Sequence, residues 1–310
     1  MNCPICSDVN TYRILKFQDI PIFQNLNYET VEEAFACEKG VMDLFFCHRC
    51  GFIYNAAFES DKMAYSKNYE NNQIYSSVFS SYIDEQINWI YDKFNLSRKK
   101  NIIEIGCGKG YYLDKLSDRL QNVKLLGFDP SYSDGIYDEK SKNISIIKDF
   151  FSEKYSDISP DIIICRHVIE HISNPLEFLS TIYQAIKNNI KCRLFFETPD
   201  AEYILKNNNY FDLPYEHCSY FSSSSIIAAF EKTGFHVVEI VKTFKEQYMW
   251  VIADICADSD ISISNELDVA LVDNFSIGIQ NFITKWQDKL KELTDTAVWG
   301  GGRRVVCLSV

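Results

Sequence analysis

The sequence lacks the features that mark a membrane or secreted protein. It has no run of 18 or more apolar residues, so we expect no transmembrane helix. The first residues, Met1-Asn2-Cys3-Pro4, carry neither the basic stretch nor the apolar stretch of a secretory signal. No internal repeat is present either. These absences predict a cytoplasmic protein.

Positive charge is also scarce. The 310 residues include 31 Lys and Arg against 43 Asp and Glu, so the formal net charge is −12. A general nucleic-acid binder needs a positive surface to replace counterions, and an anionic membrane surface attracts basic segments. We therefore expect neither partner, while the oligomeric state stays open. Hydrophobic residues make up 46% of the chain, which is enough for a sizeable core.

The 11 cysteines are scattered, and their number is odd. Without a secretory signal, this pattern favours reduced thiols and metal binding over disulfides. Four cysteines form two C-x-x-C pairs, Cys3 with Cys6 and Cys47 with Cys50. Two such pairs complete a tetrahedral S₄ site, for which Zn²⁺ is the favoured ion, and a site without an open position is structural. Ordinary buried thiols are the alternative.

The chain divides into four stretches. We expect a zinc-binding module at 1–58, a Tyr-rich helical cover at 59–98, an α/β domain at 99–256, and a helical extension at 257–310. In the third stretch, strand-like and helix-like runs alternate, which predicts a doubly wound fold on a parallel sheet. The last two strands are joined without a helix, which predicts an antiparallel edge. The expected strands cover 101–105, 124–128, 144–147, 161–165, 193–196, 235–242 and 247–255.

A glycine-rich turn follows the first strand of this domain. It reads Gly106-Cys107-Gly108-Lys109-Gly110, and Glu104 precedes it. Glycines there let the backbone turn sharply and approach a ligand closely. Asp129 ends the second strand, where a carboxylate can accept both ribose hydroxyls of a bound nucleoside. An incidental glycine-rich loop is the alternative.

The segment Glu104 to Gly110 (EIGCGKG), followed by Asp129, resembles the first motifs of the class I S-adenosylmethionine (SAM)-dependent methyltransferases. The resemblance implies a Rossmann-like sheet that binds SAM. It places the ribose at Asp129 and Pro130, adenine near Asp149 and Phe150, and the methionine end near Arg166 and His167. The implied cofactor residues in the turn are Glu104, Gly106, Cys107, Gly108 and Gly110.

A second group of reactive side chains follows the fifth strand. In an open α/β sheet, ligands bind at the carboxyl ends of the strands, so a loop in this place can reach the methyl donor. His217 can act as a base near neutral pH, and Glu216 can orient it or serve as a second acid. Tyr215 and Tyr220 can donate to a developing oxyanion. A packing histidine before the next helix is the alternative for His217.

With its Cys₄ module in front and its Glu-His loop, the chain resembles the sugar C-methyltransferase family, which acts on nucleotide-linked 4-keto deoxysugars. The resemblance implies His217 as the base, a nucleotide-sugar acceptor, and a role in capsule or other surface polysaccharide. It also suggests that Tyr69, Tyr75, His171 and Tyr220 face the substrate.

Two departures keep other acceptors open. The family's loop usually reads Tyr-His-Glu-His, whereas 214–217 reads Pro-Tyr-Glu-His, and the segment 167–171 has a form commoner in O-methyltransferases. An O-methyltransferase of a sugar or a phosphorus-linked group is therefore the main alternative. An rRNA methyltransferase and a non-catalytic zinc-ribbon scaffold are further ones.

The C-terminal stretch predicts a long amphipathic helix at 267–293, followed by Trp299-Gly300-Gly301-Gly302. In the sugar C-methyltransferases a second Rossmann-like unit begins in this way and continues for many residues. Here eight residues follow Gly302, which predicts an incomplete unit. A truncation by a frame change in a G-rich tract is the hypothesis that this pattern suggests.

Overall fold

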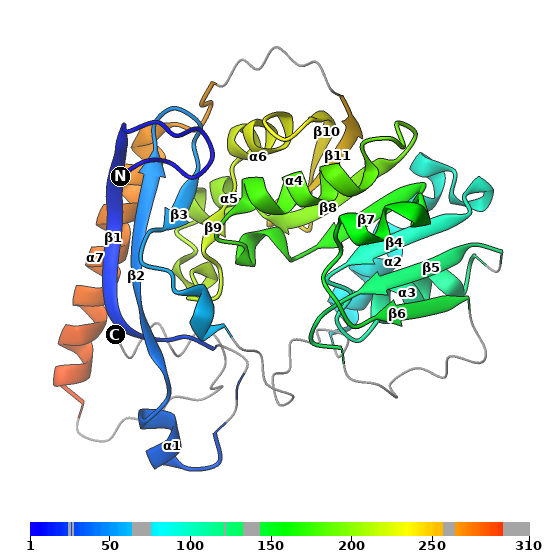
Figure 1. Ribbon diagram of the computed structural model, residues 1–310. Helices are drawn as coiled ribbons and strands as arrows, with labels where there is room; N and C mark the ends of the chain where they lie inside the picture. The colour runs from blue at the N-terminus through cyan, green and yellow to red at the C-terminus, as the bar shows by residue number, and fades with distance from the viewer. Residues whose placement is uncertain are drawn as a thin grey trace.

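The computed structural model describes residues 1–23, 26, 28–63, 76–120, 122–132, 143–256 and 264–293. These residues form a seven-stranded sheet flanked by helices and a separate four-stranded sheet (Figure 1). The large sheet has the strand order β10-β11-β8-β7-β4-β5-β6. Its strands are β4 (Asn101–Ile105), β5 (Lys124–Phe128), β6 (Ile144–Ile147), β7 (Ile162–Arg166), β8 (Arg193–Pro199), β10 (Phe235–Thr243) and β11 (Tyr248–Ile255).

Strand directions in the large sheet follow the pattern that the sequence predicts. The five strands from β6 to β8 pair in parallel. β11 is antiparallel both to β8 and to the edge strand β10. The doubly wound α/β fold with an antiparallel edge is thus confirmed. The main difference in the strand limits is β8, which continues to Pro199 rather than ending at residue 196.

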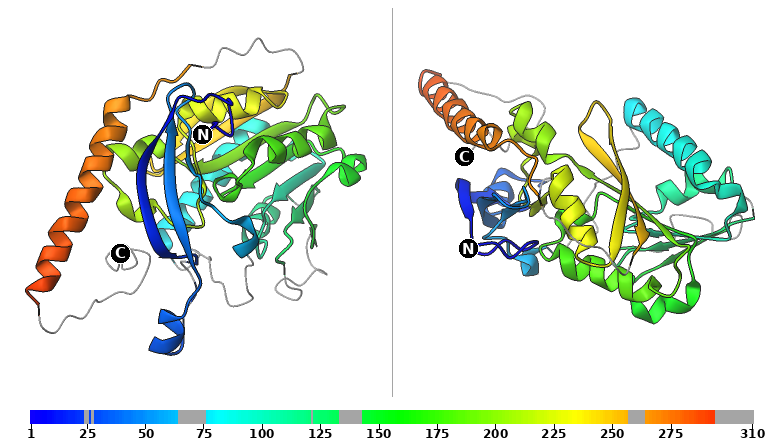
Figure 2. Two further views of the ribbon diagram at one scale, coloured as in Figure 1. Left: turned by 60° about the vertical axis from the view of Figure 1, so that its left-hand side comes forward. Right: turned by 90° about the horizontal axis from the view of Figure 1, so that it is seen from above.

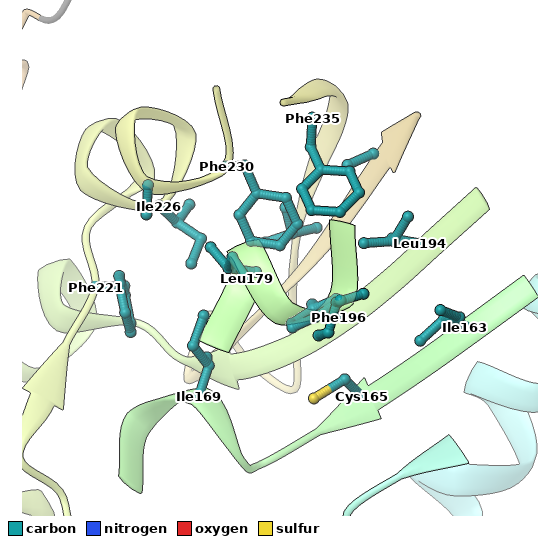
Figure 3. Close-up of a cluster of buried hydrophobic side chains, with 14 of the residues drawn as sticks. Ile163, Cys165, Ile169, Leu179, Leu194, Phe196, Phe221, Ile226, Phe230 and Phe235 are labelled. Atoms are coloured by element: carbon teal, nitrogen blue, oxygen red, sulfur yellow. The ribbon is translucent and has the colours of Figure 1, made fainter. Parts of the chain in front are cut away.

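Helices cover both faces of the large sheet. α2 (Ser77–Phe94) and α3 (Tyr111–Ser117) lie on one face, and α4 (Pro175–Ile186) and α6 (Ser223–Glu231) lie on the other (Figure 2). Each face buries its own hydrophobic cluster. Figure 3 shows the second of these faces, where Phe230 and Leu179 pack above Phe196 of β8.

The helix termini have local causes. Asn174 caps α4 by accepting the Glu177 N–H, and Pro175 stands in the first turn, where its missing N–H is tolerated. Ser222 and Ser225 form a reciprocal capping box at the start of α6. The five short 3-10 helices of the described residues are η1 (Ser60–Lys62), η2 (Leu96–Arg98), η3 (Glu153–Ile158), η4 (Ile169–His171) and η5 (Tyr210–Asp212).

The four-stranded sheet combines distant parts of the sequence. Its order is β1-β2-β3-β9, and all of its pairs are antiparallel. The first three strands are N-terminal, whereas β9 comes from the connection between β8 and α6. The N-terminal strands therefore hold a segment of the α/β domain. Their bounds are β1 (Thr11–Pro21), β2 (Lys39–Cys47), β3 (Ile53–Asn55) and β9 (Ser219–Tyr220).

Two further helices pack with this small sheet. α7 (Val269–Lys291) buries Val272, Phe275 and Ile279 in a cluster shared with β1, β2 and α5 (Ala201–Lys206). The Ser276 hydroxyl donates to the Ile14 carbonyl at 2.7 Å. α1 (Val31–Phe35), by contrast, lies at the far end of the β1–β2 ribbon and buries none of its residues (Figure 1).

Some sequence predictions fall outside the described residues. They concern Tyr69, Tyr75 and the segment 299–302. The long helix expected at 267–293 is α7. No helix in the described ranges is both long enough and apolar enough to cross a bilayer. The division into four domains, with its three boundaries, stays a prediction. β9 and α7 contact the N-terminal strands across these boundaries.

Candidate functional site

Four acidic or basic side chains meet at the carboxyl edge of the large sheet. Glu104 is near the end of β4, Asp129 follows β5, Arg166 ends β7, and Glu197 lies in β8. All three acids are buried. Because parallel strands end at the same edge, their terminal side chains converge on one region. This is the edge where the sequence predicts a cofactor site.

The glycine-rich turn adopts a backbone that other residues rarely take. Gly106, Gly108 and Gly110 have φ values of 71°, 53° and 81°, all in the left-handed region. A Cβ on Gly106 would lie 2.2 Å from the Val168 side chain, whereas a Cβ on Gly108 would meet nothing within 4 Å. The turn therefore packs tightly below Gly106 and leaves open space at Gly108. That space suits the close approach of a ligand.

Asp129 is tied to the same turn. Its Oδ2 accepts the Gly108 N–H at 2.8 Å, and its Oδ1 accepts the Ser131 N–H at 2.9 Å. The carboxylate thus lies beside the open space at Gly108. The Cys107 side chain, by contrast, points to Gly127: a Cβ there would lie 2.5 Å from the Cys107 sulfur. Cys107 therefore contributes only its backbone to the turn. Pro130 is exposed.

Glu104 lies beneath the turn as a buried acid. Its Oε2 has no hydrogen-bond partner among the described residues. Burial raises the pKa of Glu104 to about 8, although Arg166 acts in the opposite direction. A buried carboxyl with an unsatisfied oxygen is costly for the fold, and such groups gather at functional sites. Glu104 therefore fits a ligand that brings a donor or a positive charge.

Arg166 and Glu197 form a buried ion pair, of which only Arg166 was expected at the cofactor site. The two residues are opposite each other in the β7–β8 register, and Arg166 Nε donates to Glu197 Oε2 at 2.8 Å. Glu197 also accepts hydrogen bonds from Tyr82 of α2 and from Trp250 of β11. The Arg166 guanidinium lies 4.3 Å from the Tyr112 ring centroid.

The ion pair fixes the charge of Glu197. Burial by itself raises the pKa of this carboxyl, but Arg166, His167 and Tyr82 together outweigh burial, so the pKa lies below its ordinary value. Glu197 is therefore a permanent buried anion. Aligning the ends of the fourth and fifth strands would have identified it, because both strands end at the same level of the sheet.

His167 lies between two buried acids. Its Nδ1 is 3.2 Å from Glu170 Oε1, and its Nε2 is 3.5 Å from Glu197 Oε2. The backbone at His167 has a φ of 51°, a conformation that is uncommon outside glycine. Its ring packs edge-on against Tyr248. His167 thus links the ion pair to the segment after β7.

A second group, Glu170, His171 and His217, gathers next to this network. One nitrogen of each imidazole and one carboxylate oxygen lie within 4.8 Å of one another. The two rings are edge to face, with centroids 4.7 Å apart. Glu170 and His217 are buried, and His171 is half-buried. His217 lies more than 40 positions after Glu170 and His171 in the sequence, so only the fold brings it to them.

The loop that carries His217 is held by the segment after β7. His171 Nδ1 lies 3.0 Å from the Glu216 carbonyl oxygen, which can only accept, so His171 carries its proton on Nδ1. The Cys218 N–H donates to the Glu170 carbonyl at 3.0 Å. Glu216, which the sequence pairs with His217, contributes its backbone to this arrangement and is itself buried.

The two tyrosines of this loop belong to the small sheet. The Tyr215 ring is fully buried against Phe58, and its hydroxyl accepts the Glu59 N–H at 3.1 Å. Tyr220 lies on β9, and its hydroxyl donates to the Pro214 carbonyl at 3.3 Å. The structure therefore does not bring Tyr215 to the His217 cluster. The Tyr220 ring, by contrast, lies edge-on to the His217 ring, with centroids 6.2 Å apart. The role of the two tyrosines as oxyanion donors stays a prediction.

Asp149 and Phe150, expected near adenine, follow β6. The Asp149 carboxylate accepts the Tyr155 hydroxyl at 2.6 Å and pairs with Lys154, and these bonds lower its pKa to about 2, with Lys154 the larger cause. The Phe150 side chain is 71% exposed. An exposed ring at the edge of the sheet is available to a flat ligand.

The four cysteines of the two C-x-x-C pairs converge on one point. Sγ of Cys3 is 3.6 Å from Sγ of Cys50, and Sγ of Cys6 is 3.4 Å from Sγ of Cys47. A tetrahedral ion bound at about 2.3 Å from each sulfur places sulfurs about 3.8 Å apart. All four side chains are buried, and each cysteine in the described ranges is a free thiol.

The local backbone also suits a metal knuckle. The residue after each pair, Ser7 and Gly51, has a positive φ, and the N–H of each donates to the carbonyl of the first cysteine of its pair at 2.9 Å. Hydrogen bonds from Cys3 and then Cys50 lower the pKa of Cys47, whereas the hydrogen bond with Cys47 raises the pKa of Cys3. Four buried sulfurs at these distances match the tetrahedral ligand set of a structural Zn²⁺ ion, so the residues present fit this ion.

Sheet order, glycine turn and buried acids together define a class I SAM-dependent methyltransferase. A family comparison agrees with this definition, because residues 79–240 match the family described as a methyltransferase domain. The match spans more than half of the chain. The chain belongs to this family, and residues 79–240 form a methyltransferase domain of the SAM-dependent class.

Curated relatives give a narrower comparison. The chain is similar to the tRNA U34 carboxymethyltransferase of Helicobacter pylori (strain J99), with 30% identity over 185 residues. That match covers 52% of this chain and 66% of the relative. A protein with the same description from Sulfurimonas denitrificans is 29% identical over 130 residues, which cover 35% of this chain and 40% of the relative. The chain thus spans just under two thirds of the first relative's length.

Solved structures of methyltransferases are more distant. The 1,6-didemethyltoxoflavin-N1-methyltransferase of Burkholderia thailandensis, solved with its ligand and S-adenosylhomocysteine, is 11% identical with a TM-score of 0.44. It covers 58% of this chain and 81% of its own. The magnesium protoporphyrin IX methyltransferase of Synechocystis PCC 6803 is 14% identical with a TM-score of 0.41, covering 60% of this chain and 90% of its own.

Proposed function

We propose that this methyltransferase modifies a small activated metabolite, most readily a nucleotide-linked sugar for surface polysaccharide, with His217 as the general base. The observation that carries this proposal is the cluster of Glu170, His171 and His217 at the same edge as the glycine turn. A base near that edge can reach an acceptor placed against the methyl donor.

SAM fits the carboxyl edge of the sheet. Its methyl group is an electrophile carried on a positively charged sulfur. Asp129 would bind the ribose hydroxyls, and the open space at Gly108 would admit the nucleoside. Even with Glu104 protonated, Asp129, Glu170 and Glu197 outweigh the charge of Arg166, so this edge favours a cationic ligand.

His217 has the surroundings of a positioned base. The neighbouring His171 ring donates its Nδ1 proton to the Glu216 carbonyl. This nitrogen of His171 is therefore not available to accept the proton of the acceptor. In the proposed step, His217 accepts a proton from a C–H or O–H group of the acceptor. The electron pair left on the acceptor attacks the methyl carbon, and the carbon–sulfur bond breaks with its electrons going to sulfur. Burial of His217 excludes competing water.

Replacing His217 with Ala tests this assignment. We expect kcat to fall at least 100-fold, which is the usual contribution of a general base, while the Kd for SAM changes less than 3-fold. His236→Ala is the matched control, because His236 is exposed on β10 and pairs with Glu231 away from the edge. Turnover within a few-fold of the parent enzyme would exclude His217 as the base.

The nature of the acceptor atom needs a separate measurement. Carbon NMR of the product distinguishes a C-methyl from an O-methyl group, because the two carbons resonate far apart. The O-methyl alternative rests on the segment 167–171, and it requires the same base. A signal in the O-methyl range would therefore assign the proton to an O–H group, and a signal in the C-methyl range would assign it to a C–H group; either result leaves the His217 assignment unchanged.

RNA is the second candidate acceptor, and the curated relatives favour it because their names specify tRNA U34. The net charge of −12 argues the other way, since RNA binding depends on replaced counterions. Binding of tRNA measured between 50 and 200 mM salt distinguishes the two. A steep loss of affinity with salt, together with methyl transfer to tRNA, would favour RNA over a nucleotide sugar.

We further propose a structural role for Zn²⁺ at the Cys₄ cluster. The four sulfurs leave no position for water or substrate, so a bound ion would stabilise the fold rather than react. Such a small strand assembly gains much of its folding free energy from a metal.

A further inference from the structure

The loop that carries His217 is held from two sides. From the α/β domain, the Glu170 carbonyl accepts the Cys218 N–H at 3.0 Å, and His171 contacts the Glu216 carbonyl. From the small sheet, the Asn55 N–H donates to the Cys218 carbonyl at 2.9 Å. Both backbone groups of Cys218, the residue directly after His217, are therefore fixed by different parts of the molecule.

The small-sheet side of this arrangement begins at the second cysteine knuckle. The Cys47 N–H donates to the Phe52 carbonyl at 2.9 Å, which closes the knuckle directly before β3. β3 then pairs with β9 through Ile53 with Tyr220 and Tyr54 with Ser219. Only four residues separate Cys50 from Asn55. The path from the sulfurs to the His217 loop is thus short and continuous.

A second connection runs beside the first. The Ser222 hydroxyl donates to the Gly51 carbonyl at 3.2 Å, directly behind Cys50. The Phe52 and Phe221 rings pack with centroids 5.0 Å apart. The segment after β9 is therefore tied to the knuckle by a hydrogen bond and by an aromatic contact, independently of the β3–β9 ladder.

We propose that the Cys₄ centre positions His217, and that β3 and Ser222 transmit its influence to the loop. β9 has two residues and pairs only with β3 among the described strands, so it has little order of its own. When the knuckle holds its ion, β3 is fixed and the loop is fixed with it. When the ion is lost, the loop loses the support of β3 and of the Gly51 carbonyl. It keeps its contacts to the segment after β7 and to the start of α5, where the Ala201 N–H donates to the Phe221 carbonyl at 2.9 Å. The inference rests on the proposed base and the proposed metal.

Hydrogen exchange in the full-length protein tests the coupling without measuring activity. Zinc-loaded protein is compared with protein stripped by a chelator, and both carry saturating S-adenosylhomocysteine. We expect amides at 216–222 to exchange at least 10-fold faster after stripping, while the β4–β5 amides keep their protection. Unchanged exchange at 216–222 in stripped protein would overturn the proposal.

Stripping could unfold the whole small sheet, so a variant that keeps all four cysteines provides the sharper test. Ser222→Ala removes the bond to Gly51 but also weakens the α6 cap. Ser225→Ala is the matched control, because it breaks the same capping box and leaves the Gly51 bond in place. Loss of one such bond is expected to speed exchange at Cys218 and Ser219 about 5-fold in Ser222→Ala and less than 2-fold in Ser225→Ala.

Coupling must also act in the reverse direction. The Kd for zinc, measured by competition with a chromogenic chelator, should therefore be about 5-fold higher in Ser222→Ala than in Ser225→Ala, and kcat should fall while the KM for SAM stays unchanged. Equal zinc affinity in the two variants would overturn the proposal. If exchange and zinc affinity respond as expected but His217→Ala retains its activity, the coupling stands and the base assignment fails.

Discussion

The Cys₄ cluster and the carboxyl edge of the large sheet gather buried polar groups in opposite ways. The cluster takes four sulfurs from two short knuckles, and each sulfur faces the others. The carboxyl edge takes acids from three strands and from the segment after β7, and one oxygen of Glu104 stays without a partner in the described residues. A closed set of groups stabilises a fold, whereas an open, charged set is left available for a ligand.

The largest effect is expected where the closed set is broken. Cys47→Ser removes one of four sulfurs, so we expect the zinc content to fall from about one ion per chain to near zero. Because metal binding contributes folding free energy to such small units, the melting temperature should fall by 10 °C or more. Metal analysis and thermal denaturation check this.

Cys37→Ser is the control for this variant, since Cys37 lies outside the cluster and is partly exposed. It should keep both the zinc and the melting temperature. If the Cys47→Ser protein retained one tightly bound zinc ion, Cys47 would not be a required ligand, and the four cysteines would not form a closed metal site.

The next largest effect is expected at Glu104, at the carboxyl edge of the large sheet, where the stability of the fold depends on pH. The folded-state pKa of Glu104 is raised to about 8, whereas an unfolded glutamate titrates near its ordinary value of 4.5. Between these values the folded state holds a proton that the unfolded state has lost, so stability falls as pH rises through this window. One pKa unit corresponds to about 1.4 kcal/mol, so the total loss is of the order of a few kcal/mol.

Glu104→Gln should therefore give a flatter stability profile than the parent between pH 5 and pH 8. Urea denaturation at several pH values measures this. SAM affinity should rise with pH in the parent and lose that dependence in the variant, because a cation favours the ionised carboxylate. Parallel profiles for the two proteins would show that Glu104 is not the titrating group.

A smaller effect is expected at the turn itself. Gly108→Ala adds a Cβ that meets nothing within 4 Å, although its φ of 53° costs an L residue about 1 kcal/mol. We expect a slightly lower melting temperature and a SAM Kd at least 10-fold higher, because the added group fills the ligand's space. The control is Lys109→Ala, an exposed change in the same turn. Unchanged SAM binding in Gly108→Ala would place the cofactor elsewhere.

The two regions also differ in how far the sequence predicts them. The C-x-x-C pairs and the turn 106–110 are local motifs, so spacing alone identified both positions. The parallel sheet and its antiparallel edge were predicted from the alternation of elements. Tyr82, Glu197 and Trp250 meet through α2, β8 and β11, and no local pattern announces such a contact.

The loop around His217 shows the limit most clearly. Side chains at neighbouring positions in an irregular loop can point to different parts of a molecule, because no fixed period relates them. The sequence therefore suggested that Tyr215, Glu216 and His217 act together. It did not predict that the Tyr215 ring packs against Phe58 while the His217 ring lies beside His171. β9 was likewise not predicted, since two residues are too few to show alternation.

The smallest effect is expected at Tyr215, whose ring packs in the small-sheet core although it is only two positions from His217 in the same loop. Tyr215→Phe removes the hydroxyl that accepts the Glu59 N–H and keeps the ring that fills the small-sheet core. Loss of one such hydrogen bond costs about 1 kcal/mol, so stability should fall slightly while kcat stays within 2-fold. His217→Ala, two positions further along, should differ in kcat, which we expect to fall at least 100-fold. If Tyr215→Phe instead lowered kcat 10-fold or more without changing stability, Tyr215 would act in the reaction, and the boundary between the two regions would have to move to include it.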